Sequence, residues 1–220
     1  MTAKARTKPA PEPSGLSPEK IRKAALRLID QDGLAAFSTR KLGRELDCEA
    51  MAIYWYFASK EELLDAVVDE LMQGVAAAVS RRAPTELARN WIDALRDVAH
   101  AYRRIAHEHP RAFPLLATRR FSSEGTYAFL EQLFELARRQ HIDDRVAARF
   151  YRVVSSYCNG FALNEIATTS EPHTAALRRK FPRVAAVSAY LEPRYLDEMF
   201  SFGLELQLDA LARTTEAKAR

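Results

Sequence analysis

The chain has 220 residues, 48% of them hydrophobic, and 33 lysines and arginines against 29 aspartates and glutamates give a formal net charge of +4. This composition is ample for one large domain or a small one plus a larger one, and only seven glycines argue against a loop-rich or all-β protein. No apolar run could span a bilayer, no signal-peptide pattern occurs, and Cys48 and Cys158 lie far apart in different predicted elements, so we expect a cytoplasmic protein with reduced thiols.

The N-terminal residues 1–16 contain three of the ten prolines and almost no large apolar side chains, so we expect a disordered tail there. The first helix is predicted to begin after Ser17, an N-cap residue type, with Pro18 at the first helical position. It is predicted to end at Asp32-Gly33. Its apolar stripe gives the following segment a surface on which to pack.

Residues 38–60 predict two short helices joined by a tight turn, with a third helix starting directly afterwards. Leu42 and Leu46 are four residues apart and therefore share one face of the first short helix. Ile53 and Phe57 have the same spacing in the second. Helices this short are not stable alone, so we expect these faces to pack on a neighbouring core and the opposite faces to point outward.

The outward face of the second short helix suggests a contact with DNA. A recognition helix enters the major groove while the helix before it crosses the backbone, and hydroxyl and ammonium groups at helix starts suit phosphate contacts. Spacing alone fits an ordinary helical hairpin with a surface aromatic cluster equally well. The candidate DNA contacts are Ser38, Thr39, Arg40, Glu49, Ala50, Met51, Tyr54, Trp55, Tyr56 and Lys60.

Charge gives this interpretation little support. The sequence pI of about 9.1 fits a polyanionic partner. Between Ser17 and Leu63, however, eight basic residues are matched by eight acidic ones, so the predicted DNA-binding segment is formally neutral. The placement of particular side chains must therefore provide the affinity for DNA.

The same stretch resembles the DNA-binding segment of the tetracycline-repressor family of bacterial transcription regulators. The likeness rests on Thr39-Arg40-Lys41-Leu42, Ile53-Tyr54-Trp55-Tyr56-Phe57 and Lys60-Glu61-Glu62-Leu63-Leu64. It is specific over residues 20–66, and Tyr54-Trp55 and Leu64-Asp65-Ala66 look like the tetracycline-repressor branch. One departure is Asp47, which stands in the turn where the family usually has glycine, although aspartate tolerates left-handed backbone.

This resemblance implies an all-α protein with three parts: a tail at 1–16, a helix-turn-helix domain at 17–63, and an effector-binding and dimerisation domain at 64–220. The helix after Ser59 is predicted to run unbroken to about Arg81, and such a stiff, shared helix can transmit a rotation. Pro84 is predicted to open the next helix, and Pro110 and Pro114 bracket an irregular segment. Further helices are predicted at 123–140, 144–168 and 194–213, and residues 169–193 are predicted to form a loop that contains one short helix.

The family resemblance also implies a pocket for a small lipophilic effector. Large side chains with sparse polar groups fall between residues 91 and 164, and an apolar pocket with a few polar anchors suits such a ligand. Each large side chain, taken singly, fits a core better than a cavity. The candidate ligand contacts are Trp91, His100, Tyr102, Phe113, Leu116, Phe129, Phe134, Tyr151, Tyr157 and Asn164.

Tetracycline itself is not the expected effector. Relatives that bind it hold its magnesium ion with a histidine on the irregular segment, where this chain has Leu115 or Leu116. A second anchoring histidine of those relatives aligns with Ala76. The five histidines here form no metal-ligand pattern, Cys158 has no activating neighbour, and no phosphate-binding loop occurs, so we expect no metal, cofactor or catalysis.

Two chains are expected to associate through the helices at 144–168 and 194–213 as a four-helix bundle. The two helix-turn-helix domains would then lie in successive major grooves, roughly 34–36 Å apart. The candidate interface residues are Phe150, Val154, Phe161, Leu196, Met199, Gly203, Leu206 and Ala210. The leading hypothesis is thus a ligand-responsive homodimeric repressor of a double-stranded DNA operator. The alternative is an all-helical carrier or enzyme with an incidental helix-turn-helix lookalike.

Overall fold

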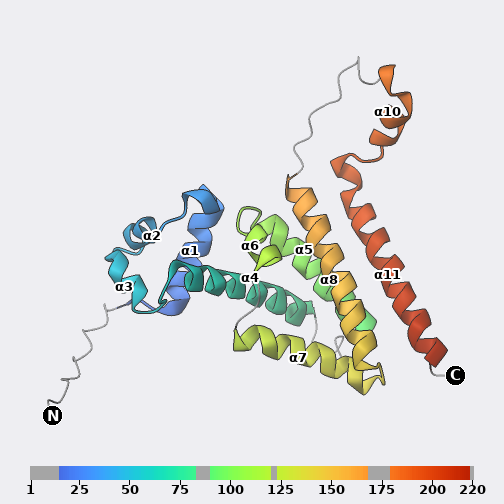
Figure 1. Cartoon of the computed structure of the whole chain (residues 1–220), viewed down its shortest axis with the longest axis horizontal. Helices are drawn as coiled ribbons and strands as arrows, with labels where there is room; N and C mark the ends of the chain where they lie inside the picture. Colours follow the sequence, from blue (N-terminus) through green and yellow to red (C-terminus); the bar gives the residue numbers. More distant parts are fainter. Residues whose placement is uncertain (1–14, 83–89, 120–122, 168–178, 219–220) are drawn as a thin grey trace, which may run out of the picture.

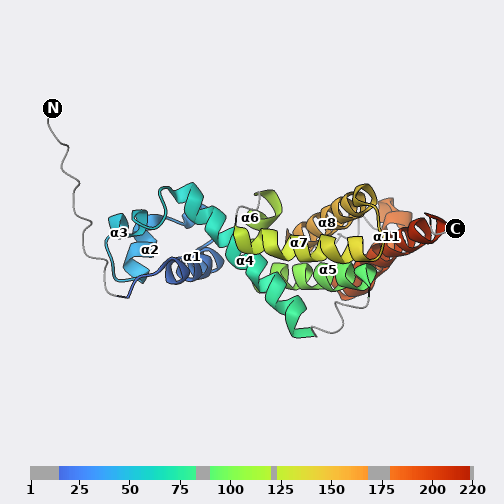
Figure 2. The ribbon, with the colours of Figure 1, turned by 90° about the horizontal axis from the view of Figure 1, so that it is seen from below.

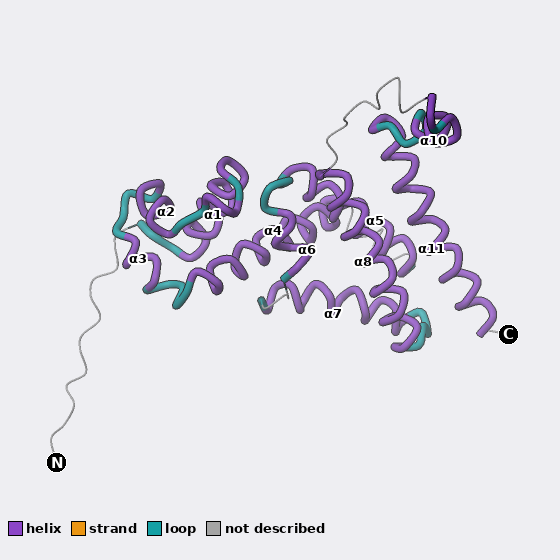
Figure 3. Tube along the Cα trace, turned by 45° about the horizontal axis from the view of Figure 1, so that its top comes forward, coloured by secondary structure: helices purple, strands orange, loops and turns teal. Residues whose placement is uncertain are grey.

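The structure is a computed structural model of the whole chain, and it describes residues 15–82, 90–119, 123–167 and 179–218. Every regular element in these ranges is helical, which confirms the all-α class. Figure 1 shows a small head at one end, a larger bundle at the other, and one long helix, α4, that leads from the head into the bundle. Where a connection lies within the described ranges, as in the head, between α5 and α6 and between α7 and α8, it is a turn or a short loop (Figure 3).

The head is made of α1 (Pro18–Asp32), the short 3-10 turn η1 (Leu34–Ala36), α2 (Thr39–Glu45) and α3 (Ala50–Tyr54). Its helix starts follow the predicted caps, because the Ser17 side chain accepts from the Lys20 amide and Ser38 accepts from the Lys41 amide. Asp47 has a φ of 52°, so the residue that replaces the usual glycine does adopt left-handed backbone.

The larger body contains α4 (Lys60–Arg82), α5 (Trp91–Glu108), α6 (Phe113–Thr118), α7 (Glu124–Arg139), α8 (Asp144–Ala167), α10 (Pro182–Ser188), η2 (Pro193–Tyr195) and α11 (Leu196–Lys218). The prediction of an irregular segment between Pro110 and Pro114 was wrong beyond residue 112. Pro114 lies in the first turn of α6, where its missing N–H leaves no helical hydrogen bond unmade.

Two predictions fall partly outside the described residues. Pro84, expected to open a helix, lies outside them, and the described α5 begins instead at Trp91 behind an Asn90 cap whose side chain accepts from the Asp93 amide. Most of the expected N-terminal tail also lies outside. The short helix expected within 169–193 is present as α10.

Two hydrophobic cores meet along α5, which contributes residues to both. The first joins α1, α2, α3, α4, α6 and the C-terminal half of α5, and the second joins α7, α8, α11 and the N-terminal half of α5. Leu63, Leu64 and Val67 of α4 are buried in the first core, which therefore continues across the predicted boundary at residues 63 and 64. Figure 2 shows α4 leaving the head and entering the bundle, where it packs on α5, α6 and α7. A displacement of α4 should therefore also move the head.

Candidate functional site

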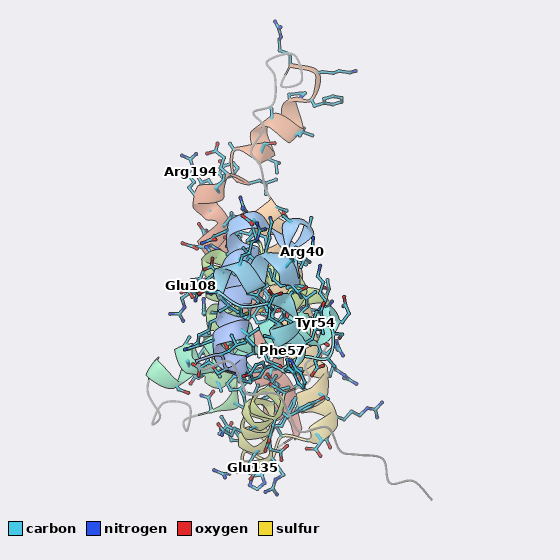
Figure 4. All side chains as sticks on the ribbon, turned by 90° about the vertical axis from the view of Figure 1, so that its left-hand side faces the viewer. Arg40, Tyr54, Phe57, Glu108, Glu135 and Arg194 are labelled. Carbon is cyan, nitrogen blue, oxygen red and sulfur yellow. The ribbon has the colours of Figure 1, made fainter. Side chains whose placement is uncertain are left out.

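The end of the head carries an exposed face made by α2 and α3. Ile53 and Phe57 are buried, as their spacing predicts, whereas Met51 and Trp55 are 69% and 70% exposed. Figure 4 looks onto this end of the molecule and shows Arg40 and Tyr54 on its surface. Exposed apolar patches often mark interaction surfaces, so this end of the head is a candidate for one.

The angle between α2 and α3 is fixed by a close approach at Gly43. The Cys48 amide donates to the Gly43 carbonyl over 2.8 Å. A Cβ at residue 43 would lie 2.7 Å from the Cys48 carbonyl oxygen and 3.2 Å from the Ala50 nitrogen, so only glycine fits. A hydrogen bond of 3.3 Å between Thr39 Oγ1 and Tyr54 Oη joins the start of α2 to the end of α3. The two helices therefore present their side chains as one surface.

The head is formally neutral, but only part of its charge is paired. Among the described residues, Asp47 and Glu49 beside α3 have no basic partner, and two cations of α2 have no acidic partner. Ion pairs occupy several of its cations: Lys23 with Glu19, Lys41 with Asp32, Arg22 with Glu70, and Arg27 more distantly with Glu45. Arg40 and Arg44, by contrast, have no acidic partner within the described residues, and both are exposed. They lie four residues apart on α2 and so share one side of the helix. Arg44 was missed in the sequence analysis, although its spacing from Arg40 could have identified it.

Some candidate DNA contacts support the head rather than extend freely from it. Tyr56 is half-buried and donates to the Leu16 carbonyl over 3.1 Å. Lys60 donates to the Phe37 carbonyl over 3.0 Å and lies over the Phe37 ring. Ser38 caps α2, Glu49 is the exposed N-cap residue of α3, and Ala50 packs close to Gly43. The DNA contacts remain predictions, carried best by Thr39, Arg40, Met51, Tyr54 and Trp55.

A cavity of about 490 Å³ lies in the larger body, between α4, α5, α6, α7 and α8. It is lined by Met72, Leu95, Val98, Ala99, Tyr102, Leu116, Ala117, Arg119, Tyr127, Phe129, Leu130, Tyr151, Arg152, Val154, Ser155, Cys158 and Asn159. Four of the ten candidate ligand contacts, Tyr102, Leu116, Phe129 and Tyr151, are among them. Its volume lies within the range of about 300–1,000 Å³ typical of small-molecule sites.

The structure places the other six candidates elsewhere. Trp91 and Phe113 are fully buried in the two cores. The rings of Phe134 and His100 pack edge-on against Tyr151 and Phe200, respectively. Tyr157 donates to the Phe200 carbonyl over 2.9 Å, and Asn164 is exposed on α8. Most of these large side chains fill space between helices, as the packing alternative proposed.

The polar groups of the cavity are neutral donors and acceptors apart from two arginines. The Tyr102 hydroxyl donates to Asn159 Oδ1. Burial raises the pKa of the Tyr102 and Tyr151 phenols, so both keep their protons at neutral pH. Burial likewise raises the pKa of Cys158 to about 12, so that it remains a thiol. In the parts of the chain that the structure describes, no group of three His, Cys, Asp or Glu residues could hold a metal ion.

The outer face of α8 and α11 differs from the predicted association seam. Val154 lines the cavity, Phe161 packs on Phe200, and the space at Gly203 is filled by Tyr157 of the same chain. These positions contact the chain's own core, because helical spacing does not say which of two neighbouring stripes faces that core. Their contact with a second chain stays a prediction.

The side chains that do point outward on these helices form an apolar surface. Phe202 and Leu206 of α11 are 66% and 54% exposed, and Val153 of α8 is also exposed. Nothing lies within 4 Å of where a Cβ of Gly160 would stand, so α8 is open to close approach there. Of the predicted seam, Leu206 belongs to this surface, whereas Phe150, Leu196, Met199 and Ala210 are partly buried. No helix within the described ranges is long and apolar enough to cross a membrane.

Comparison with known proteins accounts for both parts. A family model described as bacterial regulatory proteins of the tetR family matches residues 21–67, and one described as the tetracyclin repressor-like C-terminal domain matches residues 83–215. An HTH-type transcriptional regulator of Saccharopolyspora erythraea is 32% identical over 129 residues, which are 59% of this chain and 50% of that protein. The chain thus spans half the length of this curated relative.

Solved structures give the same architecture. A possible TetR family transcriptional regulator from Streptomyces coelicolor A3(2) superposes with a TM-score of 0.74 at 27% identity, covering 90% of this chain and 100% of that one. ActR from the same organism, in complex with (S)-DNPA, superposes with a TM-score of 0.72 at 23% identity, covering 91% and 99%. The second likeness supports the fold alone.

Proposed function

Because the chain belongs to the tetR family of bacterial regulatory proteins, we propose that it is a cytoplasmic, homodimeric repressor that leaves its DNA operator when a small lipophilic effector binds. The observation that carries this proposal is the exposed surface of α2 and α3. It combines outward aromatic side chains on α3 with Arg40 and Arg44, which lack acidic partners within the described residues. Such a surface suits base contacts from α3 and phosphate contacts from α2.

The cavity is physically linked to the head through α6. Arg119, which follows α6 and lines the cavity, donates to Asp65 of α4 over 2.6 Å and also pairs with Glu61. On the other side of α6, His109 Nδ1 and Asp30 Oδ2 of α1 are 2.6 Å apart. A ligand that favours a different position of α6 would thereby shift α1 and α4. The population of dimers whose heads are spaced for DNA would fall according to how much more tightly the ligand binds the shifted conformation.

A small-molecule carrier would also need a cavity, so the cavity does not separate the two hypotheses. The family assignment sets aside the enzyme alternative. A carrier gives no reason for the exposed α3 face to occur together with two arginines of α2 that form no ion pair within the described residues.

Mutation of Tyr54 tests the proposed DNA contact. Tyr54→Ala should weaken binding to the chain's own promoter region by about 1–3 kcal/mol, because it removes an exposed side chain that is joined to Thr39. The thermal midpoint should fall only slightly, because the variant loses one exposed hydrogen bond, which contributes about 0.5–1.5 kcal/mol at most. Salt-dependent gel shifts and thermal melts measure the two effects.

Tyr190→Ala is the control, because this tyrosine is also exposed (67%, against 37% for Tyr54) but lies next to α10, away from the head. It should leave the gel shift unchanged. Wild-type protein that gives no sequence-specific, salt-sensitive shift would count heavily against the proposed function.

A second test concerns tetracycline. Leu115 and Leu116 are buried where relatives that bind this drug are expected to supply a metal-holding histidine, and neither side chain can bind magnesium. Calorimetric titration with tetracycline and magnesium should therefore detect no binding at micromolar concentrations. Micromolar binding would contradict this prediction without affecting the proposed DNA contact.

A further inference from the structure

The cavity has two chemically different sides. Arg152, Ser155 and Asn159 are three and four residues apart and form one polar stripe along α8. The opposite wall, from α4 to α7, is mainly aliphatic and aromatic, with Met72, Leu95, Val98, Leu116, Phe129 and Leu130. A ligand that fills this space must therefore be mostly apolar, with polar groups along one edge.

The charge of the lining has one sign. None of the described residues that line the cavity is an aspartate or a glutamate, whereas Arg119 and Arg152 both are cations. Arg119 is already neutralised by Glu61 and Asp65 of α4. Arg152 has no acidic partner within the described residues and is exposed. The available positive charge thus lies at the exposed end of the polar stripe.

The other end of the stripe is partly buried and offers neutral hydrogen-bonding groups. Asn159 accepts from the partly buried Tyr102 through Oδ1, which leaves its amide N–H groups to donate. Within the described residues no hydrogen bond occupies that Asn159 nitrogen. The Tyr151 phenol, whose pKa is raised by burial, adds another protonated donor to the wall. These groups favour a ligand that accepts hydrogen bonds.

We propose that the effector is a mostly apolar organic acid whose anionic group pairs with Arg152. Its polar edge follows Ser155 toward Asn159, and its apolar body lies against the wall formed by α5, α6 and α7. A cationic ligand of the same size would meet Arg152 without any compensating carboxylate in the lining. This inference rests on the proposed function, because it assigns the chemistry of the effector cavity.

Two dyes that differ by one acidic group test the inference. Anilinonaphthalene sulfonate is an apolar aromatic anion, and phenylnaphthylamine is its uncharged parent; both report binding by fluorescence. Arg152→Gln should weaken binding of the anionic dye about fivefold, the size of one partly exposed ion pair. Binding of the uncharged dye should be unchanged, since Arg152 is at the exposed end of the cavity and contributes charge rather than packing.

Arg149→Gln provides the matched control, because Arg149 is also exposed on α8 but does not line the cavity. It should leave both dyes unaffected. An equal loss of the anionic dye in both variants, or an affinity for that dye unaltered by Arg152→Gln, would overturn the inference, as would binding of neither dye. A gel shift with each variant keeps the two proposals separate. If one of these contradicting dye results is found while DNA binding is normal, only the assignment of the effector fails and the proposed function stands.

Discussion

Gly43→Val is expected to abolish specific DNA binding. The new Cβ would stand 2.7 Å from the Cys48 carbonyl oxygen and 3.2 Å from the Ala50 nitrogen, and both are backbone atoms that cannot rotate away. Overpacking of this kind costs about 1–3 kcal/mol of stability. The smallest rearrangement that removes this clash is a movement of α3 away from α2. It separates the Thr39 and Tyr54 hydroxyls and changes the direction of the exposed aromatic side chains. We expect a loss of at least about 100-fold in operator affinity, equivalent to nearly 3 kcal/mol.

Gel shifts and thermal melts on the same preparation measure both effects. Gly125→Ala is the control, because Gly125 is exposed on α7 with nothing within 4 Å of the added Cβ. That variant should be neutral or more stable by up to about 1 kcal/mol, since alanine favours helix over glycine. Normal operator affinity in Gly43→Val would show that the contact at residue 43 does not determine how α2 and α3 present their exposed surface.

The head could be predicted almost residue by residue because its signals are local. Ser17 and Ser38 cap helices through hydrogen bonds to amides three residues ahead, and Asp47 can turn the chain without help from distant groups. Which of the charged side chains in the head form ion pairs could not be predicted from the sequence as easily. Lys41 is paired with Asp32, nine residues away, so counting charges could not show that Arg40 and Arg44 would be left without such partners in the described structure.

The sequence predicted that an apolar cavity exists, but it could not predict which residues line that cavity. Phe113 and Phe129 are both large apolar side chains on helices, yet the first is fully buried in the core and the second lines the cavity. The difference depends on how α6 and α7 pack against α4, which is a tertiary property. Arg119 and Arg152 escaped attention for a related reason, because an arginine beside a cavity has the same sequence signature as one on an ordinary solvated helix face.

Replacing both Phe202 and Leu206 by aspartate should separate the proposed pair of chains. In the single chain these side chains are 66% and 54% exposed, so the fold of one chain does not need them. In a four-helix bundle with a second copy they would be buried beside Val153 and Gly160, where four carboxylates from two chains would face an apolar surface. Light scattering should report a monomer whose helical circular dichroism is retained.

The consequence for DNA binding follows from multivalency. Two linked heads bind the duplex with an affinity about 10²–10⁴ times that of one head when both contact it together. The double variant should therefore lose at least about 100-fold in operator affinity although its α2 and α3 surface is untouched. Ala128→Asp, on an exposed position of α7, adds charge without altering this surface and should behave as wild type. A wild-type protein that is monomeric at the concentrations where it shifts its operator would refute the dimeric arrangement, since a single head would then suffice.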